Sequence, residues 1–577
     1  MPLQDENPWV LRNACRDQVL DATKRRNPVY PVISRLQLIR AVITEYITNE
    51  RHKHTSQSIA PTKEQVMTPQ TEVIRPCGNM ETYSTARHSL GLYRCVADTG
   101  RYALPQGIST LSQAKQLLQD AVAQVIAEQP FMQVGIADED RQTSSFVRVP
   151  QINLSNHIQW FPPSHPGSGS GPDFNTGASG PDATLCKHLS HQHDQLWPEL
   201  TQRPPWKISI IPTQPSQGCE PPPEIEVLYF FHHAISDGTS GSIFHRRLLN
   251  ALNNPSPSTT HHLQPNNILT LPTPPTLPLP QENLVNGRIS WPYFLRELWS
   301  AFGPAWLKPK PAATPWTGEA IRLDTPFHTN VRIVAVPAPA VSNLLAACRA
   351  QGLTLTPLIH ALVAASLARH LPSETAPSFE PSSAISMRRF AQDPTLDTDN
   401  KMCVLVTSTS HPISESLTAA LRDSSSSSDP TLETAIWTVA SSIKTDLQTR
   451  LTSLPNDDIT AMLRYVSDFH DFFRKKDGKP RGNSWEVSNL GAIEGSRSSD
   501  GQAEAEGEDG WKLTRAVFSQ SAGTVAQAFC VNVAGIAGGE TTITVTWNEA
   551  VTSPEVVEGL AGDLEVWTRK LAEGERL

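Results

Sequence analysis

The feature that most constrains the fold of this chain is a short polar segment, HHAISDG (His232 to Gly238), placed directly after an apolar run. The run from Ile225 to Phe231 is rich in β-branched and aromatic residues, which predicts a buried strand. The residues from Ile243 to Leu252 have the apolar spacing of a helix. The sequence therefore predicts a strand, a turn and a helix, with two histidines where the strand ends.

The side chains of this segment suit acid–base chemistry. If the extended conformation persists, Phe231 and His233 share one face of the strand and His232 lies on the other, so only one histidine need face a cleft. An imidazole with an ordinary pKa of about 6.5 can act as general base for a hydroxyl, amine or thiol. Asp237 can accept hydrogen bonds or pair with an arginine, and Gly238 permits a sharp turn behind the histidines.

A histidine pair alone is typical of a satisfied polar pair, but the full pattern is more specific. HHxxxDG after a buried strand resembles the signature of the CoA-dependent acyltransferase superfamily, which includes chloramphenicol acetyltransferase, plant BAHD acyltransferases and nonribosomal peptide condensation domains. Four further segments, in the expected order, are similar to the alcohol acetyltransferase family found mainly in fungi: Arg75 to Val96, Pro204 to Ile211, Ile385 to Phe390 and Trp485 to Ile493.

This resemblance implies an α/β chain with the two-lobed chloramphenicol acetyltransferase-like fold, of the condensation and BAHD type, with mixed sheets and a tunnel between the lobes. CoA is expected to enter one mouth of the tunnel and the acceptor the other. We expect an N-terminal extension at 1–70 whose order the sequence leaves open, a first lobe at 71–255, a crossover linker at 256–325 and a second lobe at 326–577. A Gly/Ser/Pro-rich surface insertion at 162–181 interrupts the first lobe.

The resemblance also assigns roles to the residues of the motif. The second histidine is the general base in the superfamily, which implies this role for His233, with His232 beside it in the catalytic segment. Asp237 is implied to be structural, through an ion pair with an arginine of the other lobe. Arg388 matches the position of that arginine best, and Arg389 is its competitor.

The implied reaction is direct transfer of an acetyl or other acyl group from acyl-CoA to the hydroxyl of an alcohol or secondary metabolite, with no acyl-enzyme. Acetyl-CoA is the expected cosubstrate, and no bound cofactor is expected. The oxyanion needs a donor, and backbone N–H groups near Gly238 and the side chain of Asn489 both stay open. Two alternative functions also stay open: a condensation-type enzyme that makes an amide from a carrier-bound acyl group, and a non-catalytic member of the fold that binds a ligand.

One segment departs from the family pattern, since Lys401-Met402-Cys403 stands where many relatives have a Met-Gly or similar pair. Other catalytic classes find no support, because the sequence has no G-x-S-x-G elbow, no P-loop and no G-x-G-x-x-G after a strand. A hydrolase or a kinase is therefore not expected.

A metal site is not expected either. One segment is dense in possible ligands but lacks the second half of a zinc motif. We interpret these residues as part of a solvated helix or loop: Cys186, His188, His191, His193 and Asp194.

Composition bounds the partners and the compartment. The 577 residues, 38% of them hydrophobic, suffice for two lobes with sizeable cores. A formal net charge of −9 without a basic run argues against nucleic acid as a partner. Eight scattered cysteines without a CxxC favour a reducing compartment. Because no apolar run approaches the ~20 residues of a membrane-spanning helix, we expect a cytoplasmic protein, with peripheral attachment to endoplasmic reticulum or a lipid droplet as the alternative. A monomer is the expected oligomeric state.

One aromatic segment, Ile289 to Trp306, has two interpretations. Trp291, Phe294, Leu298 and Phe302 fall on one helical face, which could pack against the lobes or dip into a membrane interface. We favour packing, because a buried amphipathic helix is the commoner use of such a stripe and the segment carries few basic residues.

Two more helices are predicted from their patterns. Leu111 to Glu128 has helical periodicity. A second helix begins at Pro357 with Thr356 as its N-cap, and its apolar residues surround the axis, which predicts burial on all sides. His360 within it is expected to be a core histidine.

Overall fold

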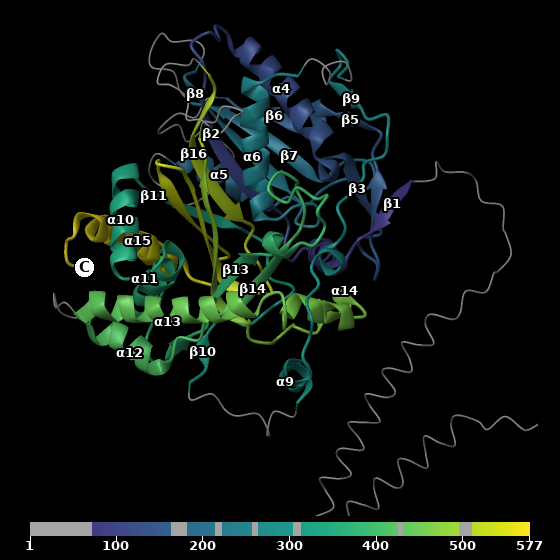
Figure 1. Ribbon diagram of the computed structural model, residues 1–577. Helices are drawn as coiled ribbons and strands as arrows, with labels where there is room; N and C mark the ends of the chain where they lie inside the picture. The colour runs from purple at the N-terminus through teal and green to yellow at the C-terminus, as the bar shows by residue number, and fades with distance from the viewer. Residues whose placement is uncertain are drawn as a thin grey trace, which may run out of the picture. The chain divides into compact units, whose positions relative to one another are not determined.

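The computed structural model describes residues 72–162, 182–213, 222–256, 263–303, 313–424, 431–495 and 510–577. The chain divides between Gln70 and Thr71 into two units, at the boundary predicted for the N-terminal extension. All elements described below belong to the second unit (Figure 1). The extension itself and most of the insertion at 162–181 lie outside the described residues.

The first lobe is a five-stranded sheet with helices on both faces. Its strands lie in the order β16 (Lys512–Gln520), β2 (Val96–Ala103), β8 (Glu224–Phe231), β7 (Trp206–Pro212) and β6 (Ile158–Trp160). Its main helices are α3 (Asn79–Ser89), α4 (Leu111–Glu128), α5 (Ala183–His193) and α6 (Gly238–Asn253). Two small sheets complete it: β1 (Val73–Pro76) with β4 (Ser145–Arg148) and β3 (Val134–Ala137), and β5 (Gln151–Asn153) with β9 (Ile268–Thr270).

The sequence predictions for the centre of this lobe are confirmed. The apolar run before the histidines is β8, and α4 has the predicted bounds. Tyr229 and Phe231 of β8 pack on the side of α4 and α6, while Leu228 and Phe230 pack on the side of α5. Figure 1 shows α4 and α6 lying across one face of the sheet. Burial on both faces explains why the strand is apolar at almost every position.

The predicted lobe boundary at 326–577 is wrong in one respect, because β16 belongs to the sheet of the first lobe. It pairs antiparallel with β2, from Lys512 opposite Ala103 to Gln520 opposite Val96. In Figure 1 this strand, coloured yellow, lies beside β2 in purple. The pairing covers an edge of β2 that would otherwise expose its backbone N–H and C=O groups. A strand pattern in the sequence does not reveal its partner, so the crossing could not be predicted.

The second lobe is a six-stranded mixed sheet packed against helices. Its strands lie in the order β11 (Asn330–Val336), β18 (Thr541–Trp547), β17 (Gln527–Ile536), β15 (Asn483–Ile493), β13 (Ser382–Ser386) and β14 (Val406–Ser410). The helices are α10 (Ala338–Ala350), α11 (Leu355–His370), α12 (Glu415–Ser424), α13 (Thr431–Ser453) and α15 (Pro554–Glu573). Shorter elements are β10 (Pro315–Trp316), β12 (Ser378–Phe379), η4 (Arg388–Phe390), η5 (Ile459–Tyr465) and α14 (Phe469–Arg474).

Helix α11 is buried all round, as predicted, but it begins two residues before Pro357 and its N-cap residue is Thr354. His360 is fully buried, with its Nε2 2.8 Å from Ser383 Oγ and its Nδ1 accepting from Trp485 Nε1 at 3.1 Å. It is the expected core histidine. Among the described residues, no single helix has the length and apolar composition for a membrane span, and α10 and α11 pass that test only as a pair bent by 95°.

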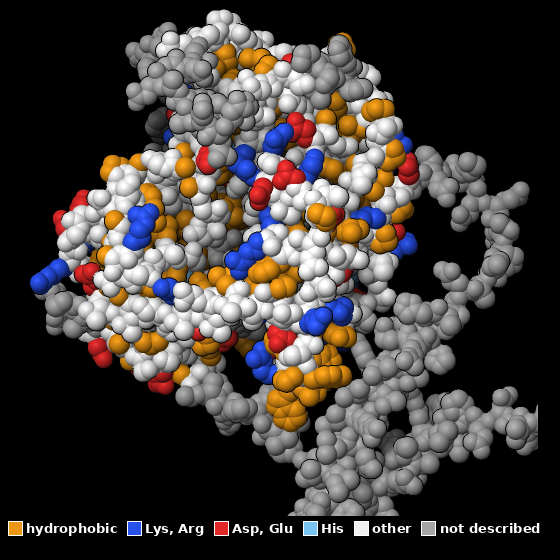
Figure 2. Space-filling model, in the orientation of Figure 1, with side chains coloured by type: hydrophobic (Ala, Val, Ile, Leu, Met, Phe, Trp, Pro, Cys, Tyr) orange, Lys and Arg blue, Asp and Glu red, His pale blue; other side chains and the backbone are white. Residues whose placement is uncertain are grey.

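The crossover between the lobes carries α8 (Gln281–Leu284) and α9 (Trp291–Phe302). The predicted packing of α9 is only partly correct. Phe294 packs edge-on against Tyr465 at 5.3 Å, but Trp291 is 70% exposed and Trp299 44% exposed. Figure 2 shows hydrophobic side chains gathered on this projecting helix. The predicted helix is present, but a sequence pattern does not identify the surface that its apolar face contacts.

Asp98 is a fully buried carboxyl group in β2, packed under the start of α6. One of its oxygens accepts a long hydrogen bond from Ser242 Oγ at 3.4 Å, and the other has no partner among the described residues. A Cβ added to Gly241 would lie 2.7 Å from the Asp98 side chain, so the first turn of α6 packs directly against this carboxyl group. Burial raises the pKa of Asp98 to about 8.

Asp98→Asn is therefore expected to gain stability relative to wild type as the pH rises from 5 to 8. The folded state holds the proton up to about pH 8, whereas an unfolded aspartate loses it near pH 3.9. Wild-type stability thus falls across this window, by about 1.4 kcal/mol for each pH unit, and asparagine does not titrate. Thermal unfolding of both proteins at pH 5 and pH 8 measures the effect. An equal difference in Tm at the two pH values would contradict it.

Candidate active site

The histidine segment forms a tight turn between β8 and α6. The strand ends at Phe231, and Ile235 N–H donates to the carbonyl of His232 at 3.1 Å. The extended conformation therefore does not continue through His233, and the predicted alternation of faces does not apply. The two rings still diverge, because His232 packs edge-on against His88 at 4.7 Å and His233 lies 5.8 Å from the ring of Tyr93.

His232 is a buried residue that shapes the turn. Its Nδ1 accepts from the Ala234 N–H at 2.9 Å, which leaves the ring proton on Nε2. Nε2 has no hydrogen-bond partner among the described residues. Burial lowers the pKa of His232 well below its ordinary value, so the ring is neutral. These contacts place His232 behind the turn, where it orients the backbone that carries His233.

His233 is half-buried, and its ring lies beside that of Tyr93. Its Nδ1 is buried without a hydrogen-bond partner among the described residues. Burial, together with the positive charge of Arg87, lowers the pKa of His233 to about 4. The imidazole is therefore neutral at physiological pH and has a free lone pair for a proton.

Asp237 joins the turn to the second lobe. Its Oδ1 accepts from Arg388 Nη2 at 2.9 Å and from both the N–H and the Oγ–H of Ser240 at 2.8 Å. Its Oδ2 accepts from Leu405 N–H at 3.0 Å. The side chains of Asp237 and Arg388 are 4% and 6% exposed, so the ion pair is buried. Arg389 is exposed and stacks on Phe390, which identifies Arg388 as the partner.

The segment that departs from the family pattern is part of the same network. Arg388 Nη1 donates to the Lys401 carbonyl at 2.8 Å, and Arg388 Nη2 donates to the Cys403 carbonyl at 3.2 Å. The hydroxyl of Ser240 lies 2.9 Å from the Cys403 carbonyl, and the Cys403 N–H donates to the same hydroxyl at 3.1 Å. The departure in sequence therefore does not remove this segment from the cross-lobe contact.

Gly238 is required for a different reason from the one predicted. Its backbone does not have a positive φ, so the turn itself does not demand glycine. A Cβ at this position would instead lie 2.8 Å from Leu490 Cδ2 and 3.1 Å from Phe518 Cζ. Gly238 thus allows close approach of the start of α6 to β15 and β16, and the prediction of a special turn conformation is corrected.

Asn489, the other oxyanion candidate, has both polar atoms engaged. Its Nδ2 donates to Thr356 Oγ1 at 3.0 Å, and its Oδ1 accepts from Gly491 N–H at 2.8 Å. This arrangement ties the S-N-L-G segment of β15 to the start of α11. It supports a structural role for Asn489, but these bonds use only one of the two N–H donors of the amide, so its oxyanion role stays a prediction.

Sequence reasoning missed a group of residues that the fold brings to the histidines. Arg87 and His88 lie in the last turn of α3, and Tyr93 follows that helix. All three residues lie in the segment Arg75 to Val96, which resembles the alcohol acetyltransferase family. The resemblance of this segment indicated the family but did not predict a role for any of the three. Glu486 and Gln520, from β15 and β16, complete the group through a bond of 3.3 Å between Gln520 Nε2 and Glu486 Oε1.

Three members of this region, His88, Glu139 and His232, hold ligand-type atoms within 4.8 Å of one another. The Trp197 N–H donates to His88 Nε2 at 3.2 Å, which leaves the ring proton of His88 on Nδ1. That nitrogen lies 2.8 Å from Glu139 Oε2 and donates to it. A metal at Nδ1 would have to replace this proton, so the donor set fits a hydrogen-bonded pair better than a metal centre.

The residues Cys186 to Asp194 form no metal-binding group among the described residues, and the predicted solvated helix or loop is wrong for Cys186 and His193, which are buried. His193 lies between Cys95 Sγ at 3.1 Å and Ser519 Oγ at 2.8 Å, deep in the first lobe. Asp194 Oδ2 lies 2.7 Å from His328 Nδ1. The ring of His188 packs against Phe161 at 4.5 Å.

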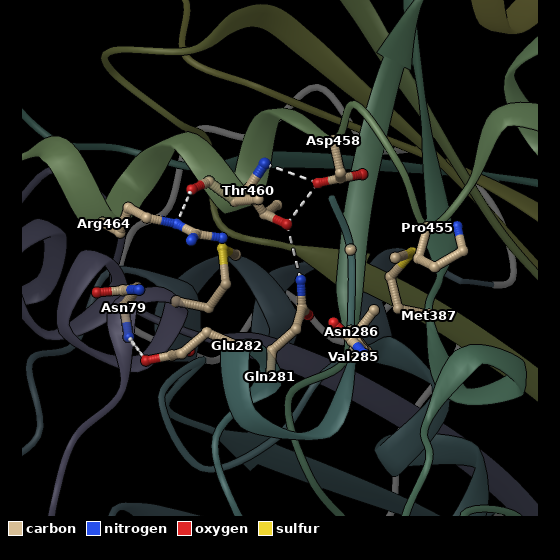
Figure 3. A pocket seen from close by; sticks show the side chains of 13 residues that line it. Asn79, Gln281, Glu282, Val285, Asn286, Met387, Pro455, Asp458, Thr460 and Arg464 are labelled. Atoms are coloured by element: carbon tan, nitrogen blue, oxygen red, sulfur yellow. Dashed lines mark hydrogen bonds between the residues drawn. The ribbon is translucent and has the colours of Figure 1, made fainter. Parts of the chain in front are cut away.

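Two pockets lie near the residues around the histidines, and neither is lined by His233. The first, of about 170 Å³, is lined by Met80 of α3, by α8, by Met387 and by the start of η5 (Figure 3). Figure 3 shows the Gln281 amide directed at Thr460, to which it donates at 2.9 Å. The second, of about 340 Å³, has Trp197 and Phe230 in its wall, and the Trp197 N–H donates to His88 Nε2.

The two lobes, each built on a mixed sheet, give the chain the two-lobed fold of acyltransferases and condensation domains. Among solved structures, the chain is similar to the TRI3 trichothecene 15-O-acetyltransferase from Fusarium sporotrichioides, with a TM-score of 0.59 and 13% identity over 90% of this chain and 100% of that one. It is also similar to the first condensation domain of the calcium-dependent antibiotic synthetase, with a TM-score of 0.50 and 12% identity over 87% and 97%. At these identities the likeness concerns the fold.

Residues 192–558 match the alcohol acetyltransferase family, so the chain belongs to the alcohol acetyltransferase family. It is 29% identical over 501 residues to the probable alcohol acetyltransferase FCK4 of Fusarium pseudograminearum (strain CS3096), covering 86% of this chain and 94% of that protein. It is 25% identical over 484 residues to the probable alcohol acetyltransferase crmB of Aspergillus fumigatus, covering 82% and 95%. These comparisons confirm the fungal family expected from the motifs and the activity of an acyltransferase.

Proposed function

We propose that the chain transfers an acetyl group from acetyl-CoA to the hydroxyl of a small-molecule alcohol, with His233 as general base. The observation that carries this proposal is the neutral, half-buried imidazole of His233, on a turn that the buried Asp237–Arg388 pair ties to the second lobe. A general base needs a free lone pair at working pH and a fixed position, and these contacts supply both.

The reaction proceeds in one complex. His233 takes the proton of the alcohol as its oxygen attacks the thioester carbonyl, and the π electrons of the carbonyl move to its oxygen. When they return, the carbon–sulfur bond breaks, and the CoA thiolate takes the proton from the imidazolium. No acyl-enzyme and no further cofactor enter this balance. General base catalysis supplies about 10² to 10⁴-fold, so positioning of both substrates supplies much of the remainder.

The tunnel between the lobes is part of this proposal. The pocket of Figure 3 supports one entrance, because elements of both lobes line it. Helix α3 carries Met80 in the wall of this pocket and Arg87 close to His233, a separation of about 10 Å along the helix axis at 1.5 Å per residue. A cytoplasmic location, a monomeric state and the absence of nucleic acid partners stay predictions.

The proposal is tested by release of free CoA thiol from acetyl-CoA, in the presence of a panel of alcohols and a parallel panel of amines. We expect release that depends on the alcohol and disappears in His233→Ala. His370→Ala is the matched control, because His370 is a partly exposed histidine at the end of α11 that pairs with Asp563 at 2.9 Å. Release that depends only on amines would favour the condensation-type reaction. No release from acetyl-CoA or longer acyl-CoA donors would contradict the proposed function.

A further inference from the structure

Arg87 is a cation in the region of His233, and it interacts electrostatically with the buried Glu486 although the two side chains form no direct ion pair. Its guanidinium carbon lies 4.5 Å from the ring centre of Tyr83 and 4.4 Å from that of Tyr93, so the group is held between two aromatic faces. Its one hydrogen bond among the described residues is long, 3.5 Å from Nη2 to Ser84 Oγ, and its Nε is buried without a partner. No carboxylate of the described residues forms an ion pair with it. Arg87 therefore keeps most of its donors available in a largely enclosed place.

The position of Arg87 is fixed relative to the general base. Tyr93, which stacks on the guanidinium, also lies 5.8 Å from the His233 ring. The Tyr93 hydroxyl donates to Gln520 Oε1 at 2.8 Å, and Gln520 Nε2 donates to Asn532 Oδ1 at 2.8 Å. Tyr93 is thus held from β16 and β17 at one end while it supports Arg87 on its face. The guanidinium of Arg87 and the imidazole of His233 therefore contact the ring of the same tyrosine.

A cation beside a general base is unfavourable for proton abstraction considered alone. Arg87 weakens the affinity of the neutral His233 for a proton, because two positive charges then face each other in an enclosed site. The balance changes when negative charge develops on the carbonyl oxygen of the acyl group. The guanidinium then stabilises the oxyanion at the same moment as the imidazole becomes positive. Such a group binds the transition state more strongly than the ground state, which is the condition for catalysis.

Two other roles for Arg87 are less well supported by its contacts. A purely structural cation–π contact would not need a guanidinium with free donors, and the flanking tyrosines already pack at the end of α3. The earlier oxyanion candidate, Asn489, is a neutral donor held by Thr356 and Gly491, whereas Arg87 is charged and would form stronger hydrogen bonds to an oxyanion. Arg87 is the charged donor of the described residues that shares an aromatic neighbour with His233.

We propose that Arg87 donates hydrogen bonds to the acyl carbonyl oxygen and stabilises its negative charge during transfer. This inference rests on the proposed function and adds the electrophilic partner of His233. The alcohol oxygen forms its bond to the carbonyl carbon, the π pair moves to the oxygen held by Arg87, and its return expels the CoA sulfur. No proton passes to or from Arg87. The planar fork of arginine suits an oxygen that gains charge in a fixed direction.

The test is steady-state kinetics of Arg87→Met and Arg87→Lys. In Arg87→Met we expect kcat to fall about 10² to 10³-fold, with the KM for acetyl-CoA and for the alcohol within about threefold of wild type. Arg87→Lys keeps the positive charge without the planar guanidinium group, so its kcat should fall less than that of Arg87→Met. In Arg87→Met the acid limb of kcat/KM should move to higher pH, because removal of a nearby cation raises the pKa of His233. In Arg87→Lys the limb should stay in place.

Arg296→Met is the matched control, since Arg296 also stacks on a tyrosine, Tyr293 at 4.9 Å, but its side chain is 70% exposed on α9. Its kcat should stay within twofold of wild type.

An unchanged kcat in Arg87→Met would overturn the inference, and so would a rise in the KM for the alcohol at unchanged kcat, which would show binding of the acceptor instead. If Arg87→Met does not fold, a kcat of Arg87→Lys equal to wild type overturns the inference, and a loss with an unmoved pH limb supports it. Wild-type protein without transfer activity would contradict the proposed function itself, and the inference with it.

Discussion

His233→Ala is expected to lower kcat by about 10² to 10⁴-fold, because the variant has no group to accept the proton of the alcohol. The Tm should change little, since the ring is half-buried and its Nδ1 makes no hydrogen bond to the described residues. His232→Ala should have the larger effect on Tm and the smaller effect on kcat. It removes the bond from Ala234 N–H and the contact with His88, so the Tm should fall while kcat declines less. Kinetics and thermal unfolding of the two variants measure both effects.

The pH profile of wild type gives an independent check on His233. Because burial and Arg87 lower its pKa to about 4, kcat/KM should stay constant from neutral pH down to about pH 5 and fall only below that. An acid limb near pH 6.5 would instead indicate an ordinary, solvated imidazole. Equal rates of His233→Ala and wild type would exclude the mechanism.

Removal of Asp237 is the second large effect. Asp237→Ala should destabilise the protein by roughly 3 to 5 kcal/mol, because it leaves the Arg388 charge buried without its counter-charge. The Leu405 N–H and the Ser240 N–H would lose their acceptor as well. Urea unfolding measures the loss of stability. We expect activity to fall with it, since this network fixes the turn that carries His233.

A double-mutant cycle separates the pair from its surroundings. Arg388→Met alone should cost about as much as Asp237→Ala, and the double variant should cost clearly less than the sum, since removal of both charges leaves none uncompensated. Arg389→Ala is the matched control and should change stability by less than about 0.5 kcal/mol, because its side chain is exposed. Additive losses for Asp237 and Arg388 would mean that the cross-lobe pair does not act as a unit.

The elements that the sequence predicted well are those whose pattern is local. The periodicity from Leu111 to Glu128 matches α4 at both ends, and the apolar run before the histidines is β8. Arg388 was also preferred correctly over Arg389 as the partner of Asp237, on the family resemblance rather than on a local pattern. For the helix and the strand the physical cause lies in the local sequence pattern, whereas the Arg388–Asp237 pair joins residues 151 apart in the chain.

The parts that could not be predicted depend on contacts between distant segments. Arg87 and Tyr93 lie some 140 residues before His233, and nothing in their own segment points to a base. Gly238 was recognised as necessary, but its reason is the approach of Leu490 and Phe518 from far along the chain. The apolar stripe on α9 likewise predicted the helix correctly but its packing only in part, because an amphipathic pattern does not identify the surface that the stripe contacts.

The pairing of β16 with β2 has a consequence for how the enzyme can move and be divided. The sheet of the first lobe includes β16, a strand from the C-terminal part of the chain. This pairing connects the two lobes by backbone hydrogen bonds and restricts hinge motion between them. Any wide opening motion would have to shear the ladder between these strands. Exchange of substrate and product is therefore best served by fixed entrances, and a fragment that ends before Lys512 would expose the raw edge of β2 to aggregation.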